Sequence, residues 1–350
     1  MLRQEGSKNT MMQKRVLRIG AVAFGLVVFL AVAGALYQFV GTRLDAHRYP
    51  PLGKLVDVGG HHLHLYCTGE GSPTVVLEAM GNGWSLYWSQ VQPAVARFTR
   101  ICSYDRAGYG WSEPGPLPRT GQRLATELHT LLTNAGVTGP YILVGHSLGG
   151  FIVRLYRSQH PADVVGMVLV DAGHEDQLQH EEFRTFFETG QRQLPAFRLT
   201  AALGVPRVLS ACGVLPPFLT QQLQQVPADM RPMLRAGWLP TQYFTTIANE
   251  TAALAETLTQ VRTSSALGDL PLVVLTANGP TWWPDLPAEV DPAKFKVMWL
   301  ALQQNLTSLS STSSQLFADK SSHFMQFDQP DIIVDGVRRV VEMARQRQAG

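Results

Sequence analysis

One pentapeptide, Gly145-His146-Ser147-Leu148-Gly149, constrains the fold of this chain more than any other feature. It lies between an apolar run at residues 140–144 and a helix-like stretch at residues 150–156. A sharp turn from a strand into a helix brings backbone atoms close together, so a Cβ atom at Gly145 or Gly149 would clash. The pattern therefore predicts a buried strand, a tight turn that exposes Ser147, and a helix that begins directly after it.

Such a turn supplies what a serine nucleophile needs. A serine hydroxyl is a weak nucleophile unless it is exposed, paired with a base and close to donors for an oxyanion. The N-terminus of the following helix also favours developing negative charge. We interpret Ser147 as a catalytic nucleophile, and the alternative is a glycine turn with a purely structural role.

A base for Ser147 is expected near the C-terminus, because chains with this elbow place the serine first, then an acid, then a histidine. His323 follows a short apolar piece at residues 315–318 and precedes Pro330 and a helix predicted over 332–345. A loop after the last strand would present His323 to the serine. The alternative is a solvated loop histidine.

Four segments together resemble the α/β-hydrolase fold family, in its serine-hydrolase branch. They are the turn around Ser147 and the stretches at residues 104–112 (Tyr-Asp-Arg-Ala-Gly-Tyr-Gly-Trp-Ser), 168–171 (Val-Leu-Val-Asp) and 322–324 (Ser-His-Phe). The resemblance implies an α/β fold, with a mostly parallel eight-stranded sheet, helices on both faces and a helical cap insertion. A serine at the nucleophile position argues against the haloalkane dehalogenase and epoxide hydrolase branches, which use an aspartate there.

The resemblance leaves the catalytic acid open. In most members the acid follows the strand after the cap, but no carboxylate stands there before Asp285. The other position used in the family is the end of the strand after the elbow helix, where Asp171 stands. We favour Asp171 over Asp285, with Glu175 and Asp176 as further alternatives. Asp171 could instead be a strand-end carboxylate that caps backbone donors.

Two backbone N–H groups are expected to form an oxyanion hole, one of them that of Leu148, directly after the serine. The second should come from the loop at residues 79–84 (Ala-Met-Gly-Asn-Gly-Trp), which lacks the common His-Gly start. We favour Gly81, with Asn82 second, over a glycine-rich turn without a catalytic use. Glu78, near the end of a buried strand, needs a partner, and we expect a structural pair with Arg106.

Strand-like and helix-like segments alternate along the chain, which predicts a mostly parallel sheet. The expected hairpin joins residues 54–58 to 62–67 through Gly59-Gly60. The other expected elements are strands at 74–79, 99–104, 164–170 and 270–276 and a helix at 123–135. Residues 174–267 break this rhythm and are predicted to form the cap within a hydrolase domain at 54–350. A net charge of +2 gives no reason to expect a nucleic-acid partner.

The N-terminal segment predicts a membrane anchor. Residues 19–40 contain no charged side chain, and a bilayer needs about 20 apolar residues. Residues 1–18 form a basic tail, which predicts a cytoplasmic N-terminus and a catalytic domain on the extracytoplasmic side of a single-pass protein. Its charged residues are Arg3, Lys8, Lys14, Arg15 and Arg18, against Glu5 alone. The alternatives are a signal peptide cleaved at 31–33 or 33–35 and a buried core helix.

Histidines and cysteines give weaker signals. His62 and His64 would share a face of a strand, but no cysteine or acidic cluster completes a metal site, so we expect neither a metal nor a cofactor. Cys67 and Cys102 fall on strands that are adjacent in the family's order. A disulfide between them is conceivable, but buried free thiols are the commoner outcome and the one we expect.

These observations predict a membrane-anchored serine hydrolase, a carboxylesterase that acts on a small-molecule ester through an acyl-enzyme. A peptidase or amidase of the proline-aminopeptidase-like branch is the enzymatic alternative. A non-catalytic binding protein on the hydrolase scaffold is the alternative from another class.

Overall fold

The computed structural model describes residues 2–264, 266–280, 282–283 and 286–349. Its eight-stranded sheet has the order β1-β2-β4-β3-β5-β6-β7-β8. The mostly parallel sheet predicted from the alternating segments is confirmed. The pairs β1–β2 and β2–β4 are antiparallel, and all other pairs are parallel. The strands are β1 Lys54–Asp57, β2 His62–Thr68, β3 Thr74–Glu78, β4 Ile101–Tyr104, β5 Tyr141–His146, β6 Val164–Val170, β7 Leu272–Ala277 and β8 Ser313–Ala318.

Helices cover both faces of the sheet, because the parallel strands are apolar on both sides. Along β5, Leu143 faces one core, and Ile142 and Val144 face the other. The first core is closed by α3 Gly121–Asn134, α4 Gly149–Gln159 and α10 Leu254–Arg262, and the second by α2 Val91–Val95, α11 Pro292–Leu306 and α13 Pro330–Ala349.

A run of helices is inserted between β6 and β7, inside the range predicted for the cap. The run comprises α5 Glu181–Ala202, α6 Val205–Ala211, α7 Pro217–Gln225, α8 Arg231–Gly237, α9 Thr241–Ala252 and the α10 helix already described. We call α5 to α10 the insertion. A third apolar cluster joins it to the sheet, with Trp238 and Tyr243 of the insertion packed on Trp84.

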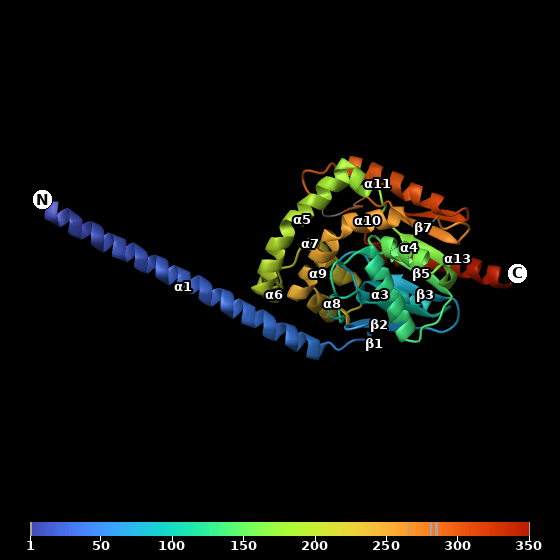
Figure 1. Ribbon diagram of the computed structural model, residues 1–350, viewed down its shortest axis with the longest axis horizontal. Helices are drawn as coiled ribbons and strands as arrows, with labels where there is room; N and C mark the ends of the chain where they lie inside the picture. Colours follow the sequence, from blue (N-terminus) through green and yellow to red (C-terminus); the bar gives the residue numbers. More distant parts are fainter. Residues whose placement is uncertain (1, 265, 281, 284–285, 350) are drawn as a thin grey trace.

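The N-terminal helix α1, Leu2–Arg48, is 47 residues long and projects away from the rest of the molecule (Figure 1). Its C-terminal part runs beside α5 and α6. Within Met12–Arg48 it is long and apolar enough to cross a membrane, with a mean hydropathy of 2.6 over a window in which no residue is buried.

One expectation about the strands is wrong. Cys67 and Cys102 form a disulfide rather than two free thiols. The antiparallel register of β2 and β4 places these two residues directly opposite each other, and sequence spacing alone does not reveal that register. Cys212 carries the remaining thiol and is exposed.

Candidate active site

Ser147 occupies a strained turn between β5 and α4. Its φ of 53° lies in the left-handed region that non-glycine residues rarely adopt. A Cβ atom at Gly145 would lie 2.6 Å from the carbonyl oxygen of Gly149. A Cβ atom at Gly149 would lie 2.6 Å from the carbonyl oxygen of Glu78. The prediction that both glycines are required by close backbone contacts is confirmed.

Asp171 and His323 meet next to this turn, although 152 residues separate them in the chain. The Nδ1 atom of His323 lies 2.6 Å from the Oδ2 atom of Asp171, and both side chains are buried. Because a carboxylate only accepts, Nδ1 carries the proton of this bond and Nε2 is left free to accept another. The loop after β8 thus brings its histidine to the carboxylate that follows β6.

The other oxygen of Asp171 is held by two donors. The backbone N–H of Ala277 and the indole Nε1–H of Trp299 each donate to Oδ1 over 3.0 Å. Asp171 also has a left-handed backbone, with a φ of 39°. Trp299 belongs to α11 and was not singled out from the sequence, since nothing local marks a tryptophan in an apolar helix as a hydrogen-bond donor.

His323 is fixed through its backbone and its ring. Its N–H donates to the carbonyl of Trp282 over 2.7 Å, and its carbonyl accepts from the Nε2–H of His146 over 2.9 Å. Trp283 stacks on the ring, with 4.1 Å between the ring centroids. Burial lowers the pKa of His146 well below its usual value, and the neighbouring His323 lowers it further, so His146 is neutral at pH 7.

Backbone hydrogen bonds link Ser147 to the segment that carries Asp171. Its N–H donates to the carbonyl of Val170 over 3.1 Å, directly before Asp171. Its own carbonyl accepts from Gly173 over 2.9 Å. Its neighbour His146 donates to the carbonyl of His323, so Ser147, Asp171 and His323 lie on adjoining segments of the backbone.

The other acid candidates lie elsewhere or outside the described residues. Glu175 forms a two-bond ion pair with Arg154, at 2.6 and 2.8 Å. Burial acts to raise the pKa of Glu175, but the bonds and charge of Arg154 outweigh it and bring the pKa to about 2. Asp176 pairs with Arg262 over 2.9 Å. Asp285 lies outside the residues that the structure describes.

The loop after β3 packs against the elbow. A Cβ atom on Gly81 would lie 3.8 Å from the side chain of Leu148, so the two expected oxyanion donors are on neighbouring backbone segments. Asn82 has a left-handed φ of 62°. A cavity of about 260 Å³ lies between α7 and the loop that carries His323, lined by Gln221, Gln225, Ser322 and Phe324 among others.

Arg106 organises the base of this loop. It pairs with Glu78 over 2.7 Å, as expected from the sequence, and donates to the carbonyls of Ala79 and Met80 over 2.8 and 2.9 Å. Its remaining donors go to Glu250 of α9, at 2.8 and 3.1 Å. All five N–H groups of the guanidinium are therefore used.

Glu250 was missed from the sequence, because nothing local indicates which residue of the insertion reaches the sheet. Burial raises the pKa of Glu78 to about 7, against the opposing effect of the Arg106 charge. Arg106 thus connects the insertion, the end of β3 and the loop beside the elbow in one buried network.

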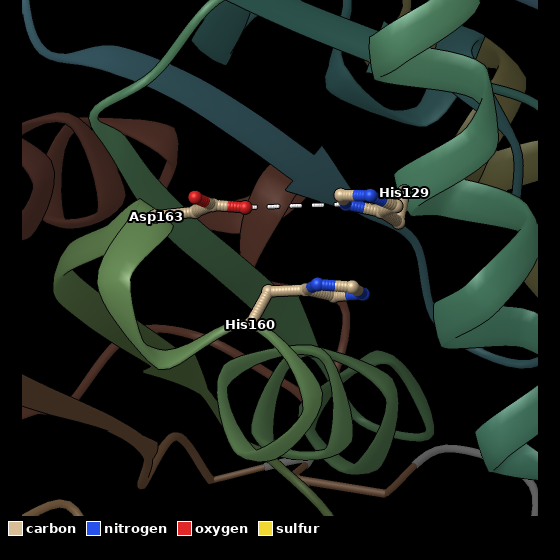
Figure 2. Close-up of side chains that lie close together, drawn as sticks. All are labelled: His129, His160 and Asp163. Carbon is tan, nitrogen blue, oxygen red and sulfur yellow. Dashed lines mark ion pairs between the residues drawn. The ribbon is translucent and has the colours of Figure 1, made fainter.

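The two strand histidines each lie against a carboxylate. The Nδ1 atom of His62 lies 2.9 Å from Glu113, and that of His64 lies 3.0 Å from Asp105. A different set of side chains, His129, His160 and Asp163, has ligand atoms within 4.8 Å of one another (Figure 2). It lies at the C-terminal end of α4, away from Ser147. The two rings are nearly parallel and 3.6 Å apart, so their nitrogen lone pairs run side by side rather than converging on one point.

Comparison with known proteins agrees with this architecture. The family model described as "Alpha/beta hydrolase family" matches residues 74–335. The chain belongs to the α/β-hydrolase family. An esterase from Thermogutta terrifontis superposes on this α/β hydrolase with a TM-score of 0.60 at 17% identity, over 83% of this chain and 98% of the esterase. The epoxide hydrolase CorEH gives the same TM-score at 16% identity, over 82% of this chain and 97% of that one. At such identities the likeness shows the fold alone.

Among curated sequences, an AB hydrolase superfamily protein of Gibberella zeae is 26% identical over 300 residues, which is 78% of this hydrolase and 87% of that protein. Other relatives are much longer. An uncharacterized vacuolar membrane protein of Saccharomyces cerevisiae is 29% identical over 136 residues, which is 34% of this chain and only 21% of that protein. An uncharacterized Schizosaccharomyces pombe protein is matched over 17% of its length.

Proposed function

We propose that this α/β hydrolase is a serine hydrolase that cleaves carboxylic esters through an acyl-enzyme. Ser147 is the nucleophile, His323 the general base and acid, and Asp171 the residue that orients His323. The backbone N–H groups of Leu148 and Gly81 form the oxyanion hole. The observation that carries the proposal is the buried 2.6 Å pair of Asp171 and His323, presented beside a serine in a strained elbow.

The chemistry follows from the direction of that pair. With its Nδ1 proton held by Asp171, His323 takes the Ser147 proton at Nε2 as Oγ attacks the ester carbonyl. Donors aimed at the new oxyanion stabilise the tetrahedral intermediate. The imidazolium then gives its proton to the leaving alkoxide, and the acyl-serine is hydrolysed by water that His323 activates in the same way.

Substrate class is tested by offering the full-length protein in detergent a series of p-nitrophenyl esters and a matched series of aminoacyl amides. We expect turnover of the esters and covalent labelling of one serine by a fluorophosphonate probe. Faster turnover of the amides would favour the aminopeptidase-like alternative. Absence of both labelling and turnover would favour a binding protein on the hydrolase scaffold.

We further propose that α1 crosses a membrane once and leaves the hydrolase domain outside the cytoplasm. The length and hydropathy of α1 support this, as does the excess of basic residues before position 19. The Cys67–Cys102 disulfide supports an oxidising compartment for the domain. The contact of Gly34 with Leu203 supports retention of the segment, because cleavage after residue 35 would remove Gly34 and cleavage after residue 33 would leave it as a free N-terminus.

A reporter fused after Gly350 is expected to be active only if it is of the kind that works outside the cytoplasm, with the chain resistant to carbonate extraction. Neutralising Lys14, Arg15 and Arg18 to glutamine should lower the outside fraction, because these charges retain the N-terminus in the cytoplasm. Activity of a cytoplasmic reporter, or a full-length chain in the soluble fraction, would contradict this topology.

A further inference from the structure

The C-terminal third of α1 has a contact face made of small and polar residues. Ala31, Gly34, Gln38, Thr42 and Asp45 recur every three or four residues and are shielded, while the α1 residues between them are mostly exposed. This spacing is one stripe of a helix. The stripe begins well inside the apolar run at residues 19–40, so α1 starts to pack on the insertion before the apolar run ends.

At its deep end this packing brings two backbones together. A Cβ atom on Gly34 would overlap the carbonyl oxygen of Leu203, and one on Gly204 would lie 2.7 Å from the carbonyl oxygen of Gly34. Four residues further along α1, Gln38 accepts from the Nε–H of Arg207 over 3.1 Å. Small residues that allow such close approach are typical of helix contacts within membranes.

The polar end of the stripe lies further toward the C-terminal ends of α1 and α6. The Nη1 atom of Arg207 pairs with Asp45 over 2.5 Å, and the side chain of Gln38 donates to the carbonyl of Leu239 over 2.7 Å. Since α6 starts beside Gly34 and its Arg207 reaches Asp45, it ascends along α1 in the same direction. The orientation of the insertion relative to α1 is therefore set by several specific contacts.

The depth of these contacts follows from helix geometry. Gly34 stands six residues before Val40, the end of the apolar run, which is about 9 Å along an α-helix. If α1 spans the bilayer as proposed above, the turn between α5 and α6 lies below the membrane surface. Interfacial helices of other proteins are buried to about this depth, roughly 5–10 Å.

The surface around that turn is largely apolar, although the charged Arg198 of α5 is also exposed there. We call it the apolar foot, and it consists of Phe197, Leu199, Val205, Val208 and Leu209, whose exposed fractions range from 39% to 62%. A cluster of large apolar side chains is rare on the free surface of a protein without a partner. Here it belongs to helices that run beside α1, whose large apolar side chains are themselves mostly exposed (Figure 1).

Beyond the foot, toward the polar end of α1, the surface becomes cationic. A cavity of about 610 Å³ between α1 and the insertion is lined by Arg48, Arg207, Arg231, Arg235 and only one acidic residue, Asp45. Along α1 the order is thus apolar, then cationic. The same order is found in a lipid leaflet, where acyl chains are followed by phosphate groups.

We propose that the apolar foot is immersed in the outer leaflet of the membrane, with the arginine-lined cavity at the level of the lipid phosphates. The insertion that covers the active site is then itself a lipid-facing element. This inference rests on the proposed span of α1 and adds a second contact with the bilayer.

The foot is tested with the full chain reconstituted in phosphatidylcholine vesicles. In a Cys212→Ser background, an environment-sensitive NBD label is attached to Leu199→Cys, and to Gln346→Cys of α13 as the control. Gln346 is exposed, and the C-terminal end of α13, to which it belongs, lies at the opposite side of the molecule from α6 (Figure 1). Doxyl groups on the lipid chains report contact with lipid, and aqueous iodide reports contact with water.

We expect a blue-shifted emission for the label at position 199, with quenching by doxyl lipid and protection from iodide. The label at 346 should show the reverse. Iodide quenching at 199 in a chain that resists carbonate extraction would overturn the foot and leave the span intact. Extraction of the chain by carbonate would overturn the span and the foot together.

Discussion

Replacing Ser147 with alanine is expected to lower the turnover of esters by about a million-fold, to the residual level set by substrate binding and the oxyanion donors. The reason is chemical: His323 loses the hydroxyl that it deprotonates, and no acyl-enzyme can form. Stopped and continuous assays with the p-nitrophenyl ester preferred in the substrate series would measure the loss.

Stability should not fall with activity, because alanine removes only the hydroxyl at a left-handed position that serine already occupies under strain. Ser322→Ala is the matched control. This serine stands beside His323, and its N–H donates to Asp328 over 2.9 Å. The control should keep fluorophosphonate labelling, and Ser147→Ala should lose it. Turnover near the wild-type level in Ser147→Ala would refute the mechanism.

Asp171→Asn is expected to reduce kcat by about 10⁴-fold while leaving the thermal midpoint nearly unchanged. An asparagine oxygen can still accept from Ala277 and Trp299, which directs its amide group toward His323. That amide donates, so Nδ1 must accept and the proton moves to Nε2. The histidine is then held in the tautomer that cannot take the serine proton. A pH–rate profile of the variant would show whether kcat stays low up to the alkaline pH at which hydroxide can replace His323 as the base.

Two controls separate Asp171 from the other acid candidates. Asp285→Asn and Glu175→Gln should each change kcat by less than about tenfold. A larger loss for Asp285→Asn than for Asp171→Asn would move the acid to the loop after β7. Small losses in all three variants would indicate Asp176 as the acid or a dyad without a carboxylate.

The parts of the fold that could be predicted from sequence are those with a local cause. Gly145 and Gly149 are required by contacts within one turn, so the elbow was evident from five residues. Continuous apolar runs gave most strands to within two residues. In most members of the family the acid lies in the loop after β7, but this chain has no carboxylate there before Asp285. The end of β6 was therefore the favoured position for the acid.

What the sequence did not reveal are the partners supplied from far along the chain. Trp299 is 128 residues from Asp171, His146 is 177 from His323, and Glu250 is 144 from Arg106. Each of these side chains would be unremarkable in its own helix or strand. Their roles depend on the register in which helices are laid over the sheet, and a single sequence carries no direct signal for that register. The disulfide was missed for the same reason.

The guanidinium of Arg106 has a consequence for how the active site can be reached. Because its donors are divided between Glu78 and Glu250, raising α9 from the sheet would break the buried ion pair of Arg106 with Glu250, and removing one partner of a buried pair typically costs about 3–5 kcal/mol. The same guanidinium holds the carbonyls of Ala79 and Met80 in the loop beside Ser147. A hinged lid that swings open as one body would therefore remove a partner, at every turnover, from the group that anchors this loop. We therefore expect α9 to stay on the sheet during turnover, so that substrate and product pass without displacing it.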